Sequence, residues 1–432
     1  MPLVRSSPSQ PVPRGRTPRP RAAGAIVAAL ALAVALGACT VPGGGARSAS
    51  TASTPGPSTT TASPSPSTTT TPPPPPVQLT PSVASGAQVP VDTVVSVAAS
   101  DGTVADVELT YKDPKKGDVN VEGKLDPNGA NWTAASLLEP ATTYSLTMSG
   151  KNTAGVEATT HSTFSTQALS KKQLIYPSVV ANGATVGVAM PVIVRFDVPV
   201  KDKAAFEKKM TVTSTPKQDG SWGWVSSSEA HWRPVSYWQP GTKVSVNVDI
   251  NSVAGGDGTY GQISTSGGFT VGQSVVMNAD LATDQMTVMV DGAAAKTIPI
   301  TGGKAGFESR SGTKVIMEKF STLRMDANTV GIEPGDPNYY DIPDVQFAMR
   351  ETNSGEFLHA APWSVSSQGK ANVSHGCIGM STDNAKWLFG IAKVGDPVVV
   401  TGTARGLEAG NGWTDWNVSY DKWKSGSALS AA

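Results

Sequence analysis

Cysteine is scarce in this chain: 432 residues contain only two, Cys39 and Cys377. Two thiols cannot build the dense disulfide framework that stabilises many small secreted domains. Because they stand at opposite ends of the sequence, each needs a separate explanation. Cys377 lies in a His-Gly-Cys turn, within the stretch VSHGCIGMS at residues 373–381.

Charged residues are also few, at 16% of the chain, and 34 Lys+Arg are balanced by 34 Asp+Glu. A chain without net charge has no overall field to attract nucleic acid. Glycine and proline, in contrast, are abundant, with 44 and 33 residues. This composition predicts β-rich modules joined by turns and at least one low-complexity segment. The length predicts roughly three domains.

Acidic residues are absent from the first 38 positions, where basic residues precede an uninterrupted apolar run at 22–36. The run is too short for a comfortable membrane span, so residues 1–38 are predicted to be a signal peptide. It ends in LGAC at 36–39, which resembles the lipobox of bacterial lipoproteins, whose cysteine is lipidated after cleavage. An ordinary signal followed by an incidental cysteine, or an uncleaved anchor, is the alternative.

All of these alternatives predict export. A lipidated Cys39 would anchor the chain on the outer face of the cell membrane, active in the cell wall space, since each buried CH₂ contributes about 0.8 kcal/mol. Cys377 would then be a free thiol in an oxidising compartment, which favours a reactive role. Residues 39–77 follow as the lipidated cysteine and a stalk, because positions 51–76 are almost entirely Ser, Thr and Pro and predict an extended linker.

A repeat follows the stalk, with Trp132 and Trp232 one hundred residues apart. A proline and then an alternating polar and apolar run come after each tryptophan. Short alternating runs between glycines and prolines indicate β-sandwiches. We therefore predict two immunoglobulin-like domains, at residues 78–168 and 169–272. They lack the cysteine pair of antibody domains, and their fold alone does not say whether they bind wall material or act as a spacer.

Residues 273–403 are predicted to form a β-rich third domain with one short helix at 382–393, where apolar residues share a face. Its expected strands lie at 286–292, 296–303, 313–317, 355–360 and 396–402. The aromatic residues of the C-terminal tail, 404–432, are expected to pack on this domain, with a ligand-binding aromatic box as the alternative. The predicted fold class is thus mainly β: two sandwiches, a β-rich catalytic domain with a short helix, and an aromatic tail.

Histidine is as informative as cysteine, because only four are present and His359 and His375 share the third domain with Cys377. A thiol is a weak nucleophile until a base or a positive environment makes it a thiolate. A histidine at a strand end, facing a glycine-flanked cysteine, would provide that environment. Gly376 and Gly379 would let the backbone approach a substrate closely, so that N–H groups there could bind an oxyanion.

Three other interpretations of these residues are disfavoured. A purely structural cysteine belongs in an apolar strand rather than directly after Ser-His-Gly. A zinc site could use His359, His375 and Cys377 with Asp341 or Asp344, but this spacing matches no usual zinc pattern. Papain-like proteases place the cysteine before the histidine, which is the reverse of the order here. We predict no metal and no cofactor.

The His-Ala pair at 359–360, a long loop and the Ser-His-Gly-Cys run at 374–377 resemble the catalytic motif of the L,D-transpeptidases. These bacterial enzymes form 3→3 cross-links in peptidoglycan. The resemblance continues through the stretches SG at 354–355 and APWS at 361–364 and through the closing DWN at 415–417. Because the signal, stalk and two sandwich modules are also similar to actinobacterial members, the resemblance covers nearly the whole mature chain.

The resemblance implies a role for each matching residue. Cys377 would be the nucleophile and His359 the general base, oriented by the backbone carbonyl of Ala360. The N–H groups of His375, Gly376 and Cys377 would form the oxyanion hole. Substrate contacts would come from an aromatic flap residue, an apolar wall residue and polar or glycine positions, namely Tyr340, Met317, Ser354, Gly355, Ser374 and Gly379.

Gly379 departs from the family pattern, which usually has Asn or Arg two residues past the cysteine. If glycine merely removes a polar substrate contact, Gly379→Asn would raise turnover a few-fold, since one hydrogen bond contributes roughly 0.5–1.5 kcal/mol net. If the residue instead has a positive φ, the same substitution would strain the backbone and lower activity.

The implied partners are peptidoglycan stem peptides, with a tetrapeptide as acyl donor and a diaminopimelate side-chain amine as acceptor. Carbapenem β-lactams are the inhibitors that the resemblance implies, and no nucleic acid is expected. Hydrolysis in place of transfer would make the chain an L,D-carboxypeptidase. A wall-binding surface lipoprotein with a degenerate catalytic domain is an alternative of another class, which the complete His-Ala and Ser-His-Gly-Cys motif disfavours.

Overall fold

The computed structural model describes residues 74–430 of the chain. The predicted signal peptide, Cys39 and most of the predicted stalk lie outside these residues. All described residues belong to one of the chain's two units, residues 71–432. Across this described part, the search for a helix long and apolar enough to cross a membrane found none.

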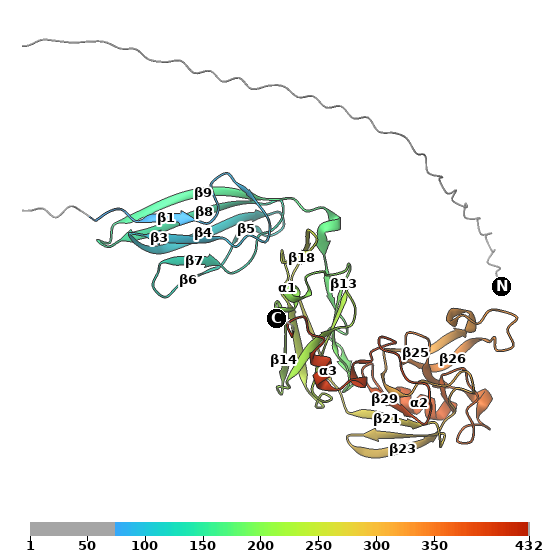
Figure 1. Cartoon of the computed structure of the whole chain (residues 1–432). Coiled ribbons are helices and arrows are strands. Elements are labelled where there is room, and N and C mark those ends of the chain that lie inside the picture. Colours follow the sequence, from blue (N-terminus) through green and yellow to red (C-terminus); the bar gives the residue numbers. More distant parts are fainter. Residues whose placement is uncertain (1–73, 431–432) are drawn as a thin grey trace, which may run out of the picture. The chain divides into compact units, whose positions relative to one another are not determined.

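The first module is an immunoglobulin-like β-sandwich, as the repeat predicts (Figure 1). Its sheets have the strand orders β1-β3-β7-β6 and β2-β9-β8-β4-β5. Side chains alternate between core and solvent along the strands, so Leu146 and Met148 of β8 are buried together with Trp132 of β7. The strands are β1 (Gln78–Pro81), β2 (Gln88–Val89), β3 (Ser96–Ser100), β4 (Gly102–Asp113), β5 (Gly117–Asn120), β6 (Gly123–Leu125), β7 (Asn131–Ala134), β8 (Thr143–Asn152) and β9 (Glu157–Thr166).

The second module repeats this design with the sheet orders β11-β13-β16-β15 and β12-β20-β17-β14. Trp232 occupies the same place as Trp132: each is buried opposite a valine of the neighbouring strand, Val192 and Val97 respectively. The main elements are β11 (Pro177–Val179), β12 (Thr185–Val186), β13 (Val192–Phe196), α1 (Lys203–Glu207), β14 (Met210–Thr215), β15 (Gly220–Trp224), β16 (Glu229–Pro234), β17 (Lys243–Val248) and β20 (Thr265–Val271). A small third sheet adds β10 (Leu174–Ile175), β18 (Ala254–Gly256) and β19 (Thr259–Gly261).

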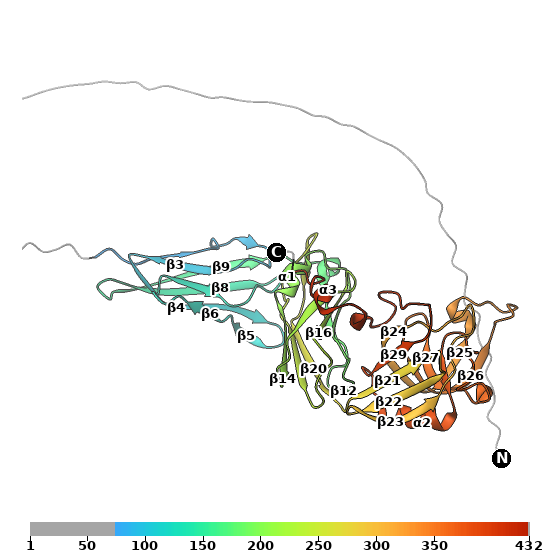
Figure 2. The ribbon, with the colours of Figure 1, turned by 60° about the horizontal axis from the view of Figure 1, so that its bottom comes forward.

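The third domain contains two sheets, ordered β23-β22-β21-β29-β24 and β25-β26-β27-β28. Figure 2 labels all the strands of the first sheet, from β23 at one edge to β24 at the other. Its helix, α2 (Thr382–Ile391), begins where the Ser381 side chain caps the N–H of Asn384, and packs against β26 and β27. The strands are β21 (Val275–Asp280), β22 (Gln285–Val290), β23 (Ala293–Pro299), β24 (Gly312–Val315), β25 (Glu318–Asp326), β26 (Asp341–Arg350), β27 (Phe357–Ala360), β28 (Ile378–Met380) and β29 (Pro397–Thr401).

Three parts of this domain were not expected from the sequence: β21, β28 and the long hairpin β25–β26. The helix and the strands β22, β23, β24, β27 and β29 fall where the pattern predicts them. Most side chains of β25 are exposed or only half-buried, so its residues lack the apolar alternation that marks a core strand. The hairpin closes through Ala327–Val330, a 3₁₀ turn capped by the Asp326 side chain. It carries Tyr340 and Ile342 to the cavity described below.

The C-terminal tail contacts the third domain, on which it was predicted to pack, and also the second sandwich. The Asn417 side chain pairs with both backbone groups of Thr313 in β24, at 2.8 and 2.6 Å. Beyond this point the contacts are with the second sandwich, where the indole N–H of Trp423 donates to Ser221 at 2.9 Å. Gly223 permits this packing, because a Cβ there would lie 2.8 Å from the indole ring. The tail includes a short helix, α3 (Tyr420–Lys424).

A buried ion cluster fixes the tail to the second sandwich. His231 of β16 is 2% exposed, and its ring nitrogens lie 2.9 Å from Asp415 and 2.8 Å from Glu229. Burial opposes the charged ring, but the two carboxylates outweigh burial and raise the pKa of His231 to about 9. The imidazolium is therefore the form that links the tail to the sandwich.

His231 is expected to make stability depend on pH. Its folded pKa of about 9 lies above the ordinary value of 6.5, so its contribution is complete below pH 6.5 and is lost as pH rises through 9. The full contribution is on the order of 3 kcal/mol. We expect the free energy of unfolding, measured by urea titration, to fall over this window, and His231→Gln to remove the fall. Exposed His161→Gln is the control, and an unchanged pH dependence in His231→Gln would contradict the assignment.

Candidate active site

Two adjacent strands bring the predicted histidine and cysteine to one cavity. β27 and β28 pair in parallel, with His359 opposite Gly379, so that Cys377 directly precedes the paired segment. The turn before it is closed by the Ser374 hydroxyl, which donates to the Cys377 carbonyl at 2.6 Å and accepts from the Gly376 N–H at 3.1 Å. Gly376 has φ +121°, a backbone conformation that residues other than glycine rarely adopt.

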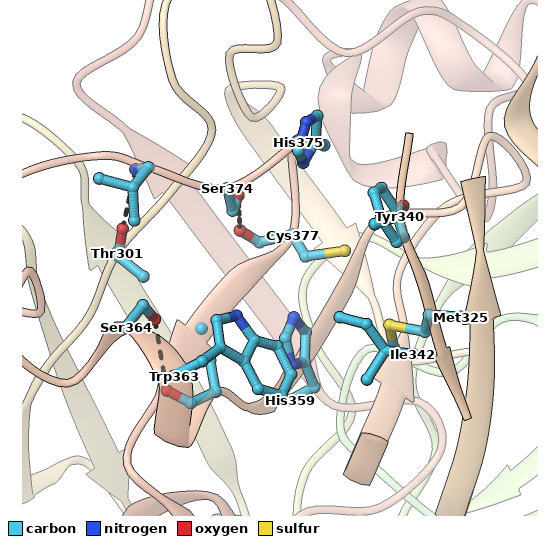
Figure 3. A pocket seen from close by; sticks show the side chains of 13 residues that line it. Thr301, Met325, Tyr340, Ile342, His359, Trp363, Ser364, Ser374, His375 and Cys377 are labelled. Carbon is cyan, nitrogen blue, oxygen red and sulfur yellow. Dashed lines mark hydrogen bonds between the residues drawn. The ribbon is translucent and has the colours of Figure 1, made fainter. Parts of the chain in front are cut away.

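The cavity has a volume of about 320 Å³ and an apolar lining with a few polar groups. Figure 3 shows His359 and Cys377 at its wall, with Tyr340 and His375 beside the sulfur. The lining residues are Thr301, Met325, Tyr340, Ile342, His359, Ala361, Trp363, Ser364, Val373, Ser374, His375, Cys377 and Gly379. A cavity that is mainly apolar, with convergent polar groups, is typical of a ligand site.

The His359 ring has a defined tautomer and is uncharged at neutral pH. Its Nδ1 lies 2.7 Å from the carbonyl oxygen of Ala360, which accepts only from a protonated nitrogen. Nε2 is therefore left as a proton acceptor. Burial lowers the pKa of His359, while the Ala360 carbonyl opposes this. A neutral imidazole with a free Nε2 at the cavity wall has the properties of a general base.

The Cys377 thiol is buried and has a backbone carbonyl as its hydrogen-bond partner. It is 9% exposed and its Sγ lies 3.7 Å from the carbonyl oxygen of Gly355, to which the S–H donates. Burial raises the pKa of Cys377 to about 12, although the backbone N–H of Phe357 opposes the rise. At neutral pH this thiol becomes a nucleophile only if a base accepts its proton.

Tyr340 and His375 form an aromatic wall above the sulfur. Their ring centroids lie 5.0 Å apart, and Phe307 contacts the other side of His375 at 4.9 Å. Burial, with a contribution from Cys377, raises the pKa of Tyr340 to about 12, so its hydroxyl stays protonated. Tyr340 thus lies over the site, where the aromatic flap residue was predicted.

The turn between β26 and β27 brings Gly355 to Cys377, whereas the neighbouring Ser354 is not among the residues that line the cavity. Gly355 has φ +92° and presents its carbonyl to Cys377. The tail fixes this turn, because the Asn411 side chain accepts from the Ser354 N–H and donates to its hydroxyl, both at 2.9 Å. No pattern in the sequence indicates the contribution of Asn411, since it lies more than fifty residues from the turn.

The prediction for Met317 is wrong. It does not line the cavity but packs against the buried core of the second sandwich, which continues into Val315 and Trp413. The apolar wall is formed instead by Met325 and Ile342 of the β25–β26 hairpin. The position was misjudged because Met317 precedes β25, on the side of the domain that faces the sandwich.

The structure corrects both expectations for Gly379. Its φ lies outside the left-handed region, so no backbone conformation demands glycine. Instead its N–H and carbonyl pair with Thr301, at 2.9 and 3.0 Å, and its Cα faces Ala361. A Cβ at this position would lie 2.9 Å from the Ala361 Cβ and 3.2 Å from the Thr301 Cγ2, closer than atoms ordinarily pack. Glycine is thus required by close approach.

We therefore expect Gly379→Asn to lower kcat/KM rather than raise it, by about tenfold, because overpacking by even one group costs about 1–3 kcal/mol. Gly379→Ala should show part of this loss, since the first added atom already meets Ala361 at 2.9 Å. Combining it with Ala361→Gly should restore activity by removing that atom. Steady-state kinetics on the three variants, compared with the wild type, decides this, and a gain with Asn would contradict the steric explanation.

The chain is similar to known proteins in both sequence and structure. The L,D-transpeptidase catalytic domain family matches residues 274–400, and the Bacterial Ig domain family matches residues 86–254. L,D-transpeptidase 2 of Mycobacterium tuberculosis is 37% identical over 354 residues, which is 81% of this chain and 85% of that protein. L,D-transpeptidase 5 of the same species is 35% identical over 344 residues, 78% of this chain and 73% of that protein.

Among solved structures, the L,D-transpeptidase LdtMt1 in complex with imipenem shares 39% sequence identity. The match covers 52% of this chain and 97% of that chain, with a TM-score of 0.46. The match to L,D-transpeptidase 2 is much longer than the third domain, so the sequence similarity includes sandwich residues as well.

Proposed function

Because the chain belongs to the L,D-transpeptidase family, we propose that it forms 3→3 cross-links between peptidoglycan stem peptides through a thioester on Cys377. The observation that carries the proposal is the arrangement of Cys377 and His359 at one apolar cavity, with His359 Nε2 free to accept a proton. A free thiol at the same cavity as a base, and without a disulfide partner among the described residues, is suited to covalent catalysis.

The roles follow from the contacts of each group. His359 accepts the Cys377 proton through Nε2, while the Ala360 carbonyl holds its ring through Nδ1. The N–H groups of His375 and Cys377 stabilise the oxyanion that forms on the scissile carbonyl. The Gly376 N–H, which the family resemblance also implied, already donates to Ser374, so we assign it to the shape of the turn.

The proposed reaction has two steps. Cys377 attacks the carbonyl carbon of the third residue of a tetrapeptide stem, an S–C bond forms, and the terminal D-Ala leaves with a proton returned by His359. The side-chain amine of a neighbouring diaminopimelate then attacks the thioester, an amide bond forms, and the thiol is regenerated. Tyr340 and Gly355 flank the sulfur and are the proposed substrate contacts, with Ser354 supporting the turn.

Product analysis tests the transfer. The mature chain is incubated with disaccharide-tetrapeptides, and the products are separated and identified by mass spectrometry. We expect a dimer that has lost one D-Ala, and no dimer from stems whose diaminopimelate amine is acetylated, because the acceptor is then absent. Tripeptide without dimer, at every acceptor concentration, would overturn cross-linking in favour of L,D-carboxypeptidase activity.

We also propose that Cys39 is lipidated and anchors the chain to the outer face of the membrane. The support is the LGAC sequence that ends the apolar run and the long Ser, Thr and Pro stalk behind it. Cys39→Ser should move the protein from the membrane fraction to the medium, while the activity of the purified protein is unchanged. Retention of this variant in the membrane fraction would favour an uncleaved anchor.

A further inference from the structure

A cluster of buried charges lies directly behind the turn that carries Cys377. The Lys314 ammonium is fully buried and lies 2.6 Å from Glu356 and 3.2 Å from Glu351. Arg310 contacts the other oxygen of Glu356 at 2.8 Å and pairs on its outer side with Glu408. Glu356 is 4% exposed, so its charge is screened little by water.

Glu356 lies close to the turn that carries the nucleophile both in the chain and in space. In the chain it stands between Gly355, whose carbonyl accepts from the thiol, and Phe357, whose N–H contacts the sulfur. In space its carboxylate lies against the turn, since a Cβ at Gly376 would be 3.5 Å from the Glu356 Oε1. The cluster is therefore placed to act on Cys377.

Stability alone does not explain such a cluster. Removing charges from water is costly, and a buried ion pair often stabilises a fold no better than apolar residues of similar volume. One oxygen of Glu351 has no partner in the described structure, and burial raises the pKa of this residue even though Lys314 opposes the rise. Because the cluster contains an unpartnered buried oxygen and lies next to the nucleophile, we infer that it affects the reactivity of Cys377.

A negative charge next to a thiol favours its protonated form, whereas a positive charge favours the thiolate. Burial is the largest cause of the raised pKa of Cys377; of the charged groups around it, the carboxylates of Glu356 and Glu351 act in the first sense and Lys314 in the second. His359 and His375 are neutral in the resting site, because burial lowers the pKa of both. The remaining titratable group that faces the sulfur is the protonated Tyr340.

We propose that the buried carboxylate of Glu356, placed by Lys314 and Arg310, is a positioning residue that adds to the effect of burial: it lowers further the small fraction of thiolate at Cys377, so that the thiol stays bonded to Gly355 until His359 accepts its proton. Thiolates, not thiols, are oxidised and alkylated, so a neutral resting thiol is protected in an oxidising compartment. The proton moves from Sγ to Nε2 only when a carbonyl carbon is in place to form the new S–C bond. The inference rests on the proposed role of Cys377 as nucleophile.

The test measures the thiol directly and needs no peptidoglycan. The mature chain with Cys39→Ser is alkylated with iodoacetamide over a range of pH, and modification of Cys377 is followed by mass spectrometry. We expect Glu356→Gln to shift the pH profile about one unit lower. Alkylation at neutral pH should then be about threefold faster, because the gain in thiolate is partly offset by its lower nucleophilicity. Glu408→Gln is the matched control, since it opens the same cluster at the surface and should leave the profile unchanged.

Arg310→Gln is expected to shift the alkylation profile in the opposite direction, and it keeps the proposal testable if Glu356→Gln does not fold. Removing this cation leaves the Glu356 carboxylate less compensated, so the profile should move to higher pH and alkylation should slow. A merely structural cluster would change both variants in the same direction. The proposal is overturned if Glu356→Gln fails to accelerate alkylation, if Arg310→Gln accelerates it, or if Glu408→Gln matches Glu356→Gln. Loss of cross-linking with an unshifted profile in Glu356→Gln or Arg310→Gln would count against this inference alone and leave the proposed function in place.

Discussion

Replacing Cys377 with alanine is expected to abolish transpeptidation while leaving the fold intact. The proposed mechanism passes through a thioester, and no other cysteine exists in residues 74–430 to form it. The side chain lies at the cavity wall and is 9% exposed, so its removal leaves no large void in the core. The change in the free energy of unfolding should be within about 1 kcal/mol.

Cys377→Ser sharpens this test, because it keeps the shape and a donor for the Gly355 carbonyl but replaces the thiol by a poorer nucleophile. Both variants should show no dimer formation, and neither should gain the mass of a carbapenem, which would add to the wild-type chain by forming a bond to Sγ. Equal thermal unfolding of the three proteins establishes that the loss is chemical. A carbapenem adduct on the alanine variant would show that another residue is the nucleophile.

The sequence predicts the fold well where one face of an element is buried. Alternating runs identified the two sandwiches, and the tryptophan repeat placed Trp132 and Trp232 in equivalent cores. The short helix after Ser381 was likewise predicted from its apolar face and its cap. The β25–β26 hairpin was missed because its strands project mainly exposed side chains, and such strands carry no periodic signal.

The site was predictable only as far as short motifs extend. Cys377, His359 and the glycines around them are recognisable because the chemistry demands these residue types and because their order and spacing resemble a family motif. The charged residues behind the turn are not, since Lys314 stands in an otherwise ordinary strand and Glu356 in a turn, where charges are usually solvated. Their burial is a property of tertiary structure, as is the bridge that Asn411 makes to Ser354.

Gly379 is a second case in which tertiary contacts could not be predicted from the sequence. Its departure from the family pattern was visible in the sequence, but its cause was not. Only the structure places Ala361 and Thr301 against its Cα. This contact explains the glycine by steric exclusion rather than by the loss of a hydrogen bond to substrate. A glycine in a strand often marks such a close approach.

The second large effect is expected at His359. Replacing it with alanine removes the acceptor for the thiol proton, and general-base catalysis contributes about 10²–10⁴-fold. The pH dependence should reveal the role. In the wild type, activity should decline below the pKa of His359, which burial places under its ordinary value of 6.5, and should be flat above neutrality. In His359→Ala the only route to the thiolate is direct ionisation of a thiol whose pKa is about 12.

The residual kcat/KM of His359→Ala should therefore rise about tenfold for each pH unit above neutrality, because thiolate increases tenfold per unit below its pKa. The two profiles should converge at high pH, which a variant with a damaged cavity would not do. His161→Ala, at an exposed histidine of the first sandwich, is the control and should follow the wild type. A pH-independent residual activity in His359→Ala would contradict the base assignment, since it would mean that the thiol loses its proton to another group.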